Sequence, residues 1–95
     1  LFMEKRKITN LDKLDFKPFD KYGELIKGWY WHKINFDEKT NFRTYISKLE
    51  LGTKTIPHTH TGHEEFLILD GELIDSDGSI FKKGLFNFNF YERTQ

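Results

Sequence analysis

The sequence predicts an all-β domain of the kind that forms a sandwich or a barrel. Short apolar stretches alternate with polar residues at a period of two, as in half-buried strands. Turn-forming glycine and aspartate residues separate these stretches, and no segment keeps the 3.6-residue period of a helix over a useful length. Aromatic residues make up 17% of the chain, and ten of them are Phe. Such large rings suit the core of a narrow barrel.

Length and charge limit the possible functions. The 95 residues are enough for a single domain, 1–95. Fifteen basic residues balance fifteen acidic ones, which gives no reason to expect nucleic acid or an anionic membrane as a partner. There is no cysteine, so disulfides, thiolate ligands and cysteine nucleophiles are excluded. No apolar stretch approaches the roughly 20 residues of a membrane span, and we expect a cytoplasmic protein.

The chain divides into an N-terminal arm, 1–23, and a barrel, 24–95. The apolar residues of the arm fit neither a helix nor a strand, and we expect an extended segment that pairs with a second subunit. Residues 24–36 form the first long strand. One of its faces carries Ile26, Gly28, Tyr30, His32, Ile34 and Phe36, and the other carries Leu25, Lys27, Trp29, Trp31, Lys33 and Asn35.

Further strands follow at short intervals. A polar connection, 37–41, leads to a strand over 42–51, so the two long strands are expected to form an antiparallel hairpin. Asp70-Gly71 predicts a two-residue hairpin between Leu69 and Glu72. Further bends are expected at 75–78 and 82–84, before a last strand over 85–91 in which Phe and Asn alternate.

The stretch 52–71 holds the candidate functional residues. His58 and His60 are two apart, so in an extended segment both imidazoles leave the same face. Thr61-Gly62 supplies a bend, and Glu64-Glu65 opens the next strand. Only one of these carboxylates can face the histidines, because neighbouring strand residues point to opposite faces. Two imidazoles and one carboxylate suit one divalent ion (Zn, Fe, Mn or Ni) and leave coordination positions open.

These residues resemble the first signature of the cupins. That signature reads glycine, five residues, His-x-His, three or four residues, Glu, six residues, glycine, and this sequence has Gly52, His58-Thr-His60, Glu64 and Gly71 at those positions. The residues around this motif are most similar to those of the ChrR-like cupins. The resemblance implies a small double-stranded β-helix, or jelly-roll barrel, and it favours His58, His60 and Glu64 as the metal ligands.

The C-terminal part departs from the cupin pattern. Many cupins supply a further histidine from a second signature with a Pro-x-Gly turn, but here no histidine follows His63, and the residues at 90–93 replace the turn. Either the site uses three protein ligands, or Gln95, His63 or water completes it. We therefore expect a barrel that is incomplete at its C-terminus, and a homodimer in which the partner subunit closes the open wall.

Two classes of function remain. The first is a metal-binding cupin that holds a small ligand or acts as a sensor. The second is a metal-dependent enzyme, most plausibly an iron dioxygenase, since an ion held by two His and one carboxylate keeps positions open for substrate and oxygen. No catalytic group stands out, because Glu65 should face away from the ion and Tyr30 and Tyr45 suit packing roles. His32 is expected to be a satisfied or partly exposed histidine.

Overall fold

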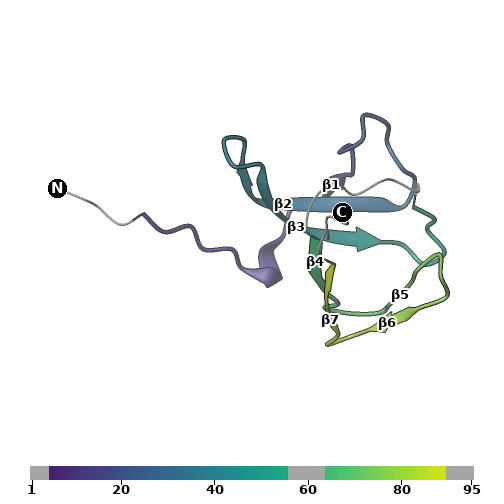
Figure 1. Ribbon diagram of the computed structural model, residues 1–95. Helices are drawn as coiled ribbons and strands as arrows, with labels where there is room; N and C mark the ends of the chain where they lie inside the picture. The colour runs from purple at the N-terminus through teal and green to yellow at the C-terminus, as the bar shows by residue number, and fades with distance from the viewer. Residues whose placement is uncertain (1–4, 56–63, 90–95) are drawn as a thin grey trace, which may run out of the picture. The chain divides into compact units, whose positions relative to one another are not determined.

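The computed structural model describes residues 5–55 and 64–89, and in these residues the chain is all-β (Figure 1). The predicted fold class is thus confirmed. The chain divides into two compact units, Leu1–Ile56 and Pro57–Gln95, called here the first and the second unit. In order, the elements are a 3-10 helix Leu11–Lys13, β1 Lys17–Pro18, β2 Trp29–Asp37, β3 Phe42–Leu49, β4 Glu64–Leu67, β5 Glu72–Ile74, β6 Ile80–Lys82 and β7 Phe86–Asn89.

The first unit is built on the predicted long hairpin. Strands β2 and β3 are antiparallel, from Trp29 opposite Leu49 to Asp37 opposite Phe42. A four-residue loop joins them, and Asn41 in this loop takes the left-handed conformation with φ 58°. The hairpin prediction is confirmed, but β2 begins at Trp29 and not at residue 24. Gly28, with φ 84°, and the bond from the N–H of Trp29 to the carbonyl of Ile26 make a turn before it.

A β-bulge changes which face of β2 its last residues occupy. The register shifts between Lys33 and Asn35, so Ile34 is an extra residue on β2. Because one added residue reverses the alternation, Phe36 joins the face of Trp31. The two ring centroids lie 5.6 Å apart, edge to face. The predicted grouping of Phe36 with Tyr30 and His32 is therefore wrong, since strict alternation does not anticipate a bulge.

Part of the predicted arm belongs to the first unit's own sheet. Lys17 and Pro18 pair with Trp31 and Tyr30 of β2, which makes β1 an edge strand, where proline is tolerated. The N–H of Phe19 then donates to the carbonyl of Trp29 at 3.0 Å. Over these residues the arm pairs with its own chain, and the expected pairing with a second subunit stays a prediction.

The core of the first unit is aromatic. Among residues 5–55, the buried apolar side chains are those of Phe19, Trp29 and Trp31, and Phe19 is fully buried. The Phe19 ring stacks on Trp29 at 3.8 Å and meets Trp31 edge to face at 4.7 Å. Partly buried side chains complete the cluster, namely Ile26, Phe36, Tyr45 and Leu49. Burial of such large rings supplies most of what this small unit needs to fold.

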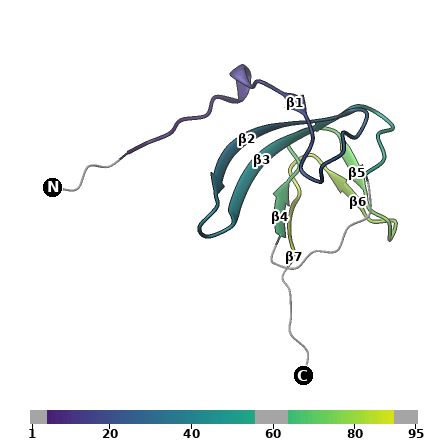
Figure 2. The ribbon, with the colours of Figure 1, turned by 90° about the horizontal axis from the view of Figure 1, so that it is seen from above.

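The second unit is one long hairpin bent in its middle (Figures 1 and 2). Strand β4 pairs with β7, and β5 pairs with β6. Between the two pairs, Ile68 donates its N–H to the carbonyl of Leu85 at 3.0 Å and accepts from the N–H of Gly84 at 2.8 Å. The two short sheets are thus joined by backbone hydrogen bonds at the bend.

In the second unit, the turn predicted at Asp70-Gly71 does not join two strands that pair with each other. Asp70-Gly71 lies at the bend, because β4 and β5 on either side of it pair with other strands. The two-residue hairpin predicted there is therefore wrong. The turn of this hairpin is at residues 75–79, where Asp75 donates its N–H to the carbonyl of Ser79 at 2.8 Å. Among residues 5–55 and 64–89, no helix has the length and apolar character to cross a membrane.

Candidate metal site

The structure describes one of the three predicted metal ligands. Glu64 is the first residue of β4, whereas His58 and His60 lie outside the described residues, as do His63 and Gln95. Within 5–55 and 64–89, no three His, Asp or Glu side chains are grouped so that they could hold an ion. The ligand set of His58, His60 and Glu64 therefore stays a prediction.

Glu64 and Glu65 point to opposite faces of the β4–β7 sheet. Glu64 is half-buried and its Oε2 is shielded from solvent, whereas Glu65 is exposed. Pairing with β7 explains this difference, because it extends the backbone from Glu64 to Leu67 and makes the side chains alternate. Of the two carboxylates, the one at the signature position is directed to the shielded face.

Asn87 shares the shielded face with Glu64. Its strand partner is Phe66, which lies two residues from Glu64, so Asn87 is diagonal to Glu64 at a typical separation of about 7–8 Å. The Nδ2 of Asn87 is shielded from solvent and has no hydrogen-bond partner in the described part of the chain. A shielded amide donor of this kind is costly unless a partner satisfies it.

The sequence does not reveal this role for Asn87. Its strand alternates Phe and Asn, and either set alone is compatible with an inward face. The structure turns Asn87 inward and leaves Phe86 exposed. The sequence signal that could have pointed to this role is an asparagine, Asn87, between two phenylalanines of the same strand.

Two phenylalanines support the shielded face. Phe66 of β4 and Phe81 of β6 meet edge to face, with ring centroids 5.2 Å apart. Because these strands lie on either side of the bend, the contact fixes the bend and defines its inner side. Glu64 and Phe66 share one face of β4, so this face carries a ring beside the carboxylate as well as the amide of Asn87.

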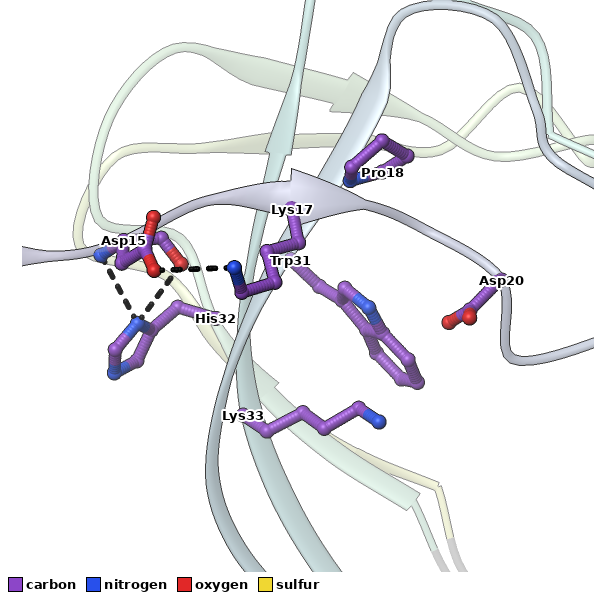
Figure 3. A pocket seen from close by; sticks show the side chains of 7 residues that line it. All are labelled: Asp15, Lys17, Pro18, Asp20, Trp31, His32 and Lys33. Carbon is purple, nitrogen blue, oxygen red and sulfur yellow. Dashed lines mark hydrogen bonds and ion pairs between the residues drawn. The ribbon is translucent and has the colours of Figure 1, made fainter.

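The remaining histidine, His32, belongs to β2 of the first unit. It lines a cleft of about 370 Å³ in the first unit, at the point where β1 ends (Figure 3). Its Nδ1 accepts from the N–H of Asp15 at 3.1 Å and lies 3.2 Å from the Asp15 carbonyl oxygen. The prediction of a satisfied, partly exposed histidine is confirmed.

Three of the charged side chains in that cleft, Asp15, Lys17 and Lys33, have partners nearby. Lys17 and Asp15 form an ion pair at 3.4 Å between exposed side chains, which contributes little to stability. The Lys33 ammonium lies 4.7 Å from the centre of the Trp31 ring. Cations and carboxylates are mixed along the cleft, so its lining favours no single class of charged ligand.

The two tyrosines weighed as catalytic groups have structural contacts. The Tyr30 hydroxyl donates to Oε1 of Glu50 at 3.2 Å, and the Glu50 carboxylate raises the pKa of Tyr30 by Coulomb repulsion of the phenolate and by this hydrogen bond. The Tyr45 ring packs against Trp31 at 5.4 Å. Both tyrosines thus have contacts within the first unit.

An all-β chain with a carboxylate on a shielded sheet face, shortly after a His-x-His motif, has the character of a cupin. The family model that matches is that of the ChrR cupin-like domain, and the match covers residues 4–94. The chain therefore belongs to the ChrR cupin-like family, which confirms the resemblance in its sequence. Comparison with curated proteins and with solved structures found no match.

One described residue, Glu64, fits a bound metal ion. It supplies a carboxylate whose Oε2 is shielded from solvent, and an ion would compensate the cost of shielding that charge. The nearby His58-Thr-His60 supplies the nitrogen donors that Zn and the transition metals prefer.

Proposed function

We propose that this chain is a metal-binding cupin domain with a small-ligand or sensor role. One divalent ion, Zn, Fe, Mn or Ni, is held by His58, His60 and Glu64. The observation that carries the proposal is the opposite orientation of the two neighbouring carboxylates, with Glu64 on the shielded face of β4 and Glu65 exposed. Strand alternation turns one of two neighbouring carboxylates to each face, and the one turned to the shielded face is Glu64, at the position that the cupin signature gives to a ligand.

Asn87 suggests what kind of small molecule is bound. Its amide N–H faces the same side as Glu64 and lacks a partner within the described residues. A ligand with an acceptor oxygen would satisfy this donor, and the ion would act as a Lewis acid toward an oxygen of the same molecule. We therefore expect small oxygen-rich ligands, such as carboxylates, to bind better than amines.

The surroundings support binding more than catalysis. A general acid or base must reach the reacting atoms, yet Glu65 is exposed and the hydroxyl of Tyr30 is engaged with Glu50. The raised pKa of Tyr30 also keeps the phenol protonated, which makes it a poor base. The iron dioxygenase stays the alternative, because the same three ligands would serve it.

The test is the metal content of purified protein by elemental analysis. We expect about one ion per chain, lost in His58→Ala and in His60→Ala. His32→Ala is the matched control, since His32 lies in the first unit against Asp15, and it should keep the ion. Unchanged metal content in His58→Ala would refute the site. If the ion is iron, oxygen uptake with small organic acids would bring the dioxygenase alternative forward.

A further inference from the structure

Asn87 and Glu64 are neighbours on the shielded face, although they are far apart in the sequence. In the β4–β7 sheet Glu64 lies opposite Asn89, and Phe66 lies opposite Asn87, so Asn87 is the diagonal neighbour of Glu64 (Figure 1). Diagonal neighbours on one face of a sheet are within reach of a long side chain such as that of glutamate. The Asn87 amide and the Glu64 carboxylate can therefore meet.

The two side chains carry complementary hydrogen-bonding groups. The Nδ2 of Asn87 is a donor with two N–H groups, and the Oε2 of Glu64 is an acceptor. Both atoms are shielded from solvent, and Nδ2 has no hydrogen-bond partner in the described part of the chain. Because water does not reach this amide, a protein group or a bound molecule must satisfy it.

The half-buried side chains of the second unit offer one acceptor for this amide. Apart from Glu64 and Asn87, those described in residues 64–87 are all apolar, namely Phe66, Ile68, Leu73 and Phe81. Glu65 points to the opposite face of β4. Among these half-buried side chains, the Glu64 carboxylate is therefore the one that can accept from Asn87.

We propose that Asn87 is a positioning residue whose amide donates to the Glu64 carboxylate and holds it for the metal ion, an inference that rests on the proposed function. A hydrogen bond restricts the rotation of the flexible glutamate side chain, so less conformational entropy is lost when the carboxylate binds an ion. The second N–H of the amide stays available for an oxygen of the bound small molecule.

This role predicts different effects on stability and on metal affinity. Asn87→Leu replaces the amide by an apolar group of similar size and removes a shielded donor, so the metal-free protein should be as stable as the wild type or more stable. Metal binding should weaken, because hydrogen-bond partners of metal ligands typically contribute about 10–100-fold in affinity. A side chain that only supports the fold would not separate these two effects.

The test is the dissociation constant for Zn²⁺, an ion that both His and Glu bind, measured by competition with a chromogenic chelator. Asn35→Leu is the matched control, because Asn35 is an exposed residue of β2 in the first unit. We expect the constant to rise at least about tenfold in Asn87→Leu and to stay within about twofold in Asn35→Leu. Thermal unfolding of the metal-free proteins should show no loss of stability in Asn87→Leu.

A double-variant cycle shows whether Asn87 acts through Glu64. In the Glu64→Ala background the carboxylate to be held is absent, so Asn87→Leu should change the Zn²⁺ dissociation constant by less than about twofold. An equal loss of affinity in both backgrounds would overturn the positioning role, and so would an unchanged constant in Asn87→Leu alone. If Asn87→Leu does not fold, Asn87→Ala repeats the measurement, since it also removes the donor.

Failure of the positioning role is distinguishable from failure of the metal site. Wild-type protein that binds none of Zn²⁺, Fe²⁺, Mn²⁺ and Ni²⁺ would refute both. Binding that is lost in His58→Ala but unchanged in Asn87→Leu would overturn only the role of Asn87.

Discussion

The two units of this chain bury their apolar residues to different degrees. The first unit encloses Phe19, Trp29 and Trp31 in an aromatic cluster. In the second unit, no side chain described in residues 64–87 is buried, and the apolar ones are half-buried or exposed. Both units are β hairpins, so the difference lies in which side chains the strands carry and in what covers them.

The buried core lies in the first unit, whereas the described residues of the candidate site lie in the second. The first unit has its own buried core, so we expect its stability to depend little on a ligand. The second unit holds Glu64 and Asn87 on its shielded face and has no buried side chain among residues 64–87, so its stability should depend on what it binds. Binding sites are commonly located in parts of low intrinsic stability.

The largest expected effect is loss of the first unit's core. Phe19→Ala removes a fully buried ring that stacks on Trp29, and should lower the free energy of unfolding by about 3–5 kcal/mol. Phe81→Ala removes a half-buried ring of the second unit and should cost about 1–2 kcal/mol. Denaturant unfolding monitored by fluorescence gives both values. Equal losses would contradict the contrast between the units.

The next effect concerns the turn that starts β2. A Cβ at Gly28 would collide with Oγ1 of Thr53, and φ is 84°. Gly28→Ala should therefore cost about 2–4 kcal/mol, from backbone strain and overpacking together. Gly52→Ala is the matched control, because φ is 82° but its Cβ meets nothing within 4 Å, and it should cost about 1–2 kcal/mol.

A second substitution separates the two causes at Gly28. Thr53→Ala removes the hydroxyl that the added Cβ would meet, so in the Gly28→Ala background it should recover stability by thermal or denaturant unfolding. If the double variant is no more stable than Gly28→Ala, the close approach of Thr53 is not the cause.

The smallest expected effect is on pH dependence in the first unit. The Glu50 carboxylate raises the pKa of Tyr30 above its ordinary value of 10.0. The folded state therefore favours the protonated phenol, and the stabilisation is complete below pH 10.0 and is lost as the pH rises through the folded pKa. Absorbance titration against Tyr30→Phe should show that Glu50→Gln lowers the pKa of Tyr30. An unchanged pKa would contradict the coupling.

The sequence predicted the fold class and the long hairpin well, because both rest on local patterns. Alternation over β2 and β3 and the polar loop between them are read directly from the residues. The bulge at Ile34 was not predictable, since it depends on how β2 pairs with β3. The bend at Asp70-Gly71 was missed for a similar reason, because a turn dipeptide does not show which strands pair around it.

The candidate site was predicted in part. The signature spacing selected Glu64 over Glu65, and the observed alternation agrees with that choice of face. Asn87 was not anticipated, because its position depends on pairing between β4 and β7, which are distant in the sequence. The part of the predicted arm at Lys17 and Pro18 joined the first unit's own sheet, because Phe19 completes the aromatic core.

The most direct test of the central claim uses the two neighbouring carboxylates. Glu64→Gln and Glu65→Gln make the same chemical change at adjacent residues, one half-buried and one exposed. Elemental analysis of both variants beside the wild type should show that Glu64→Gln loses most of its bound ion while Glu65→Gln keeps it. Equal metal content in the two variants, or loss only in Glu65→Gln, would contradict the assignment of Glu64 as a metal ligand.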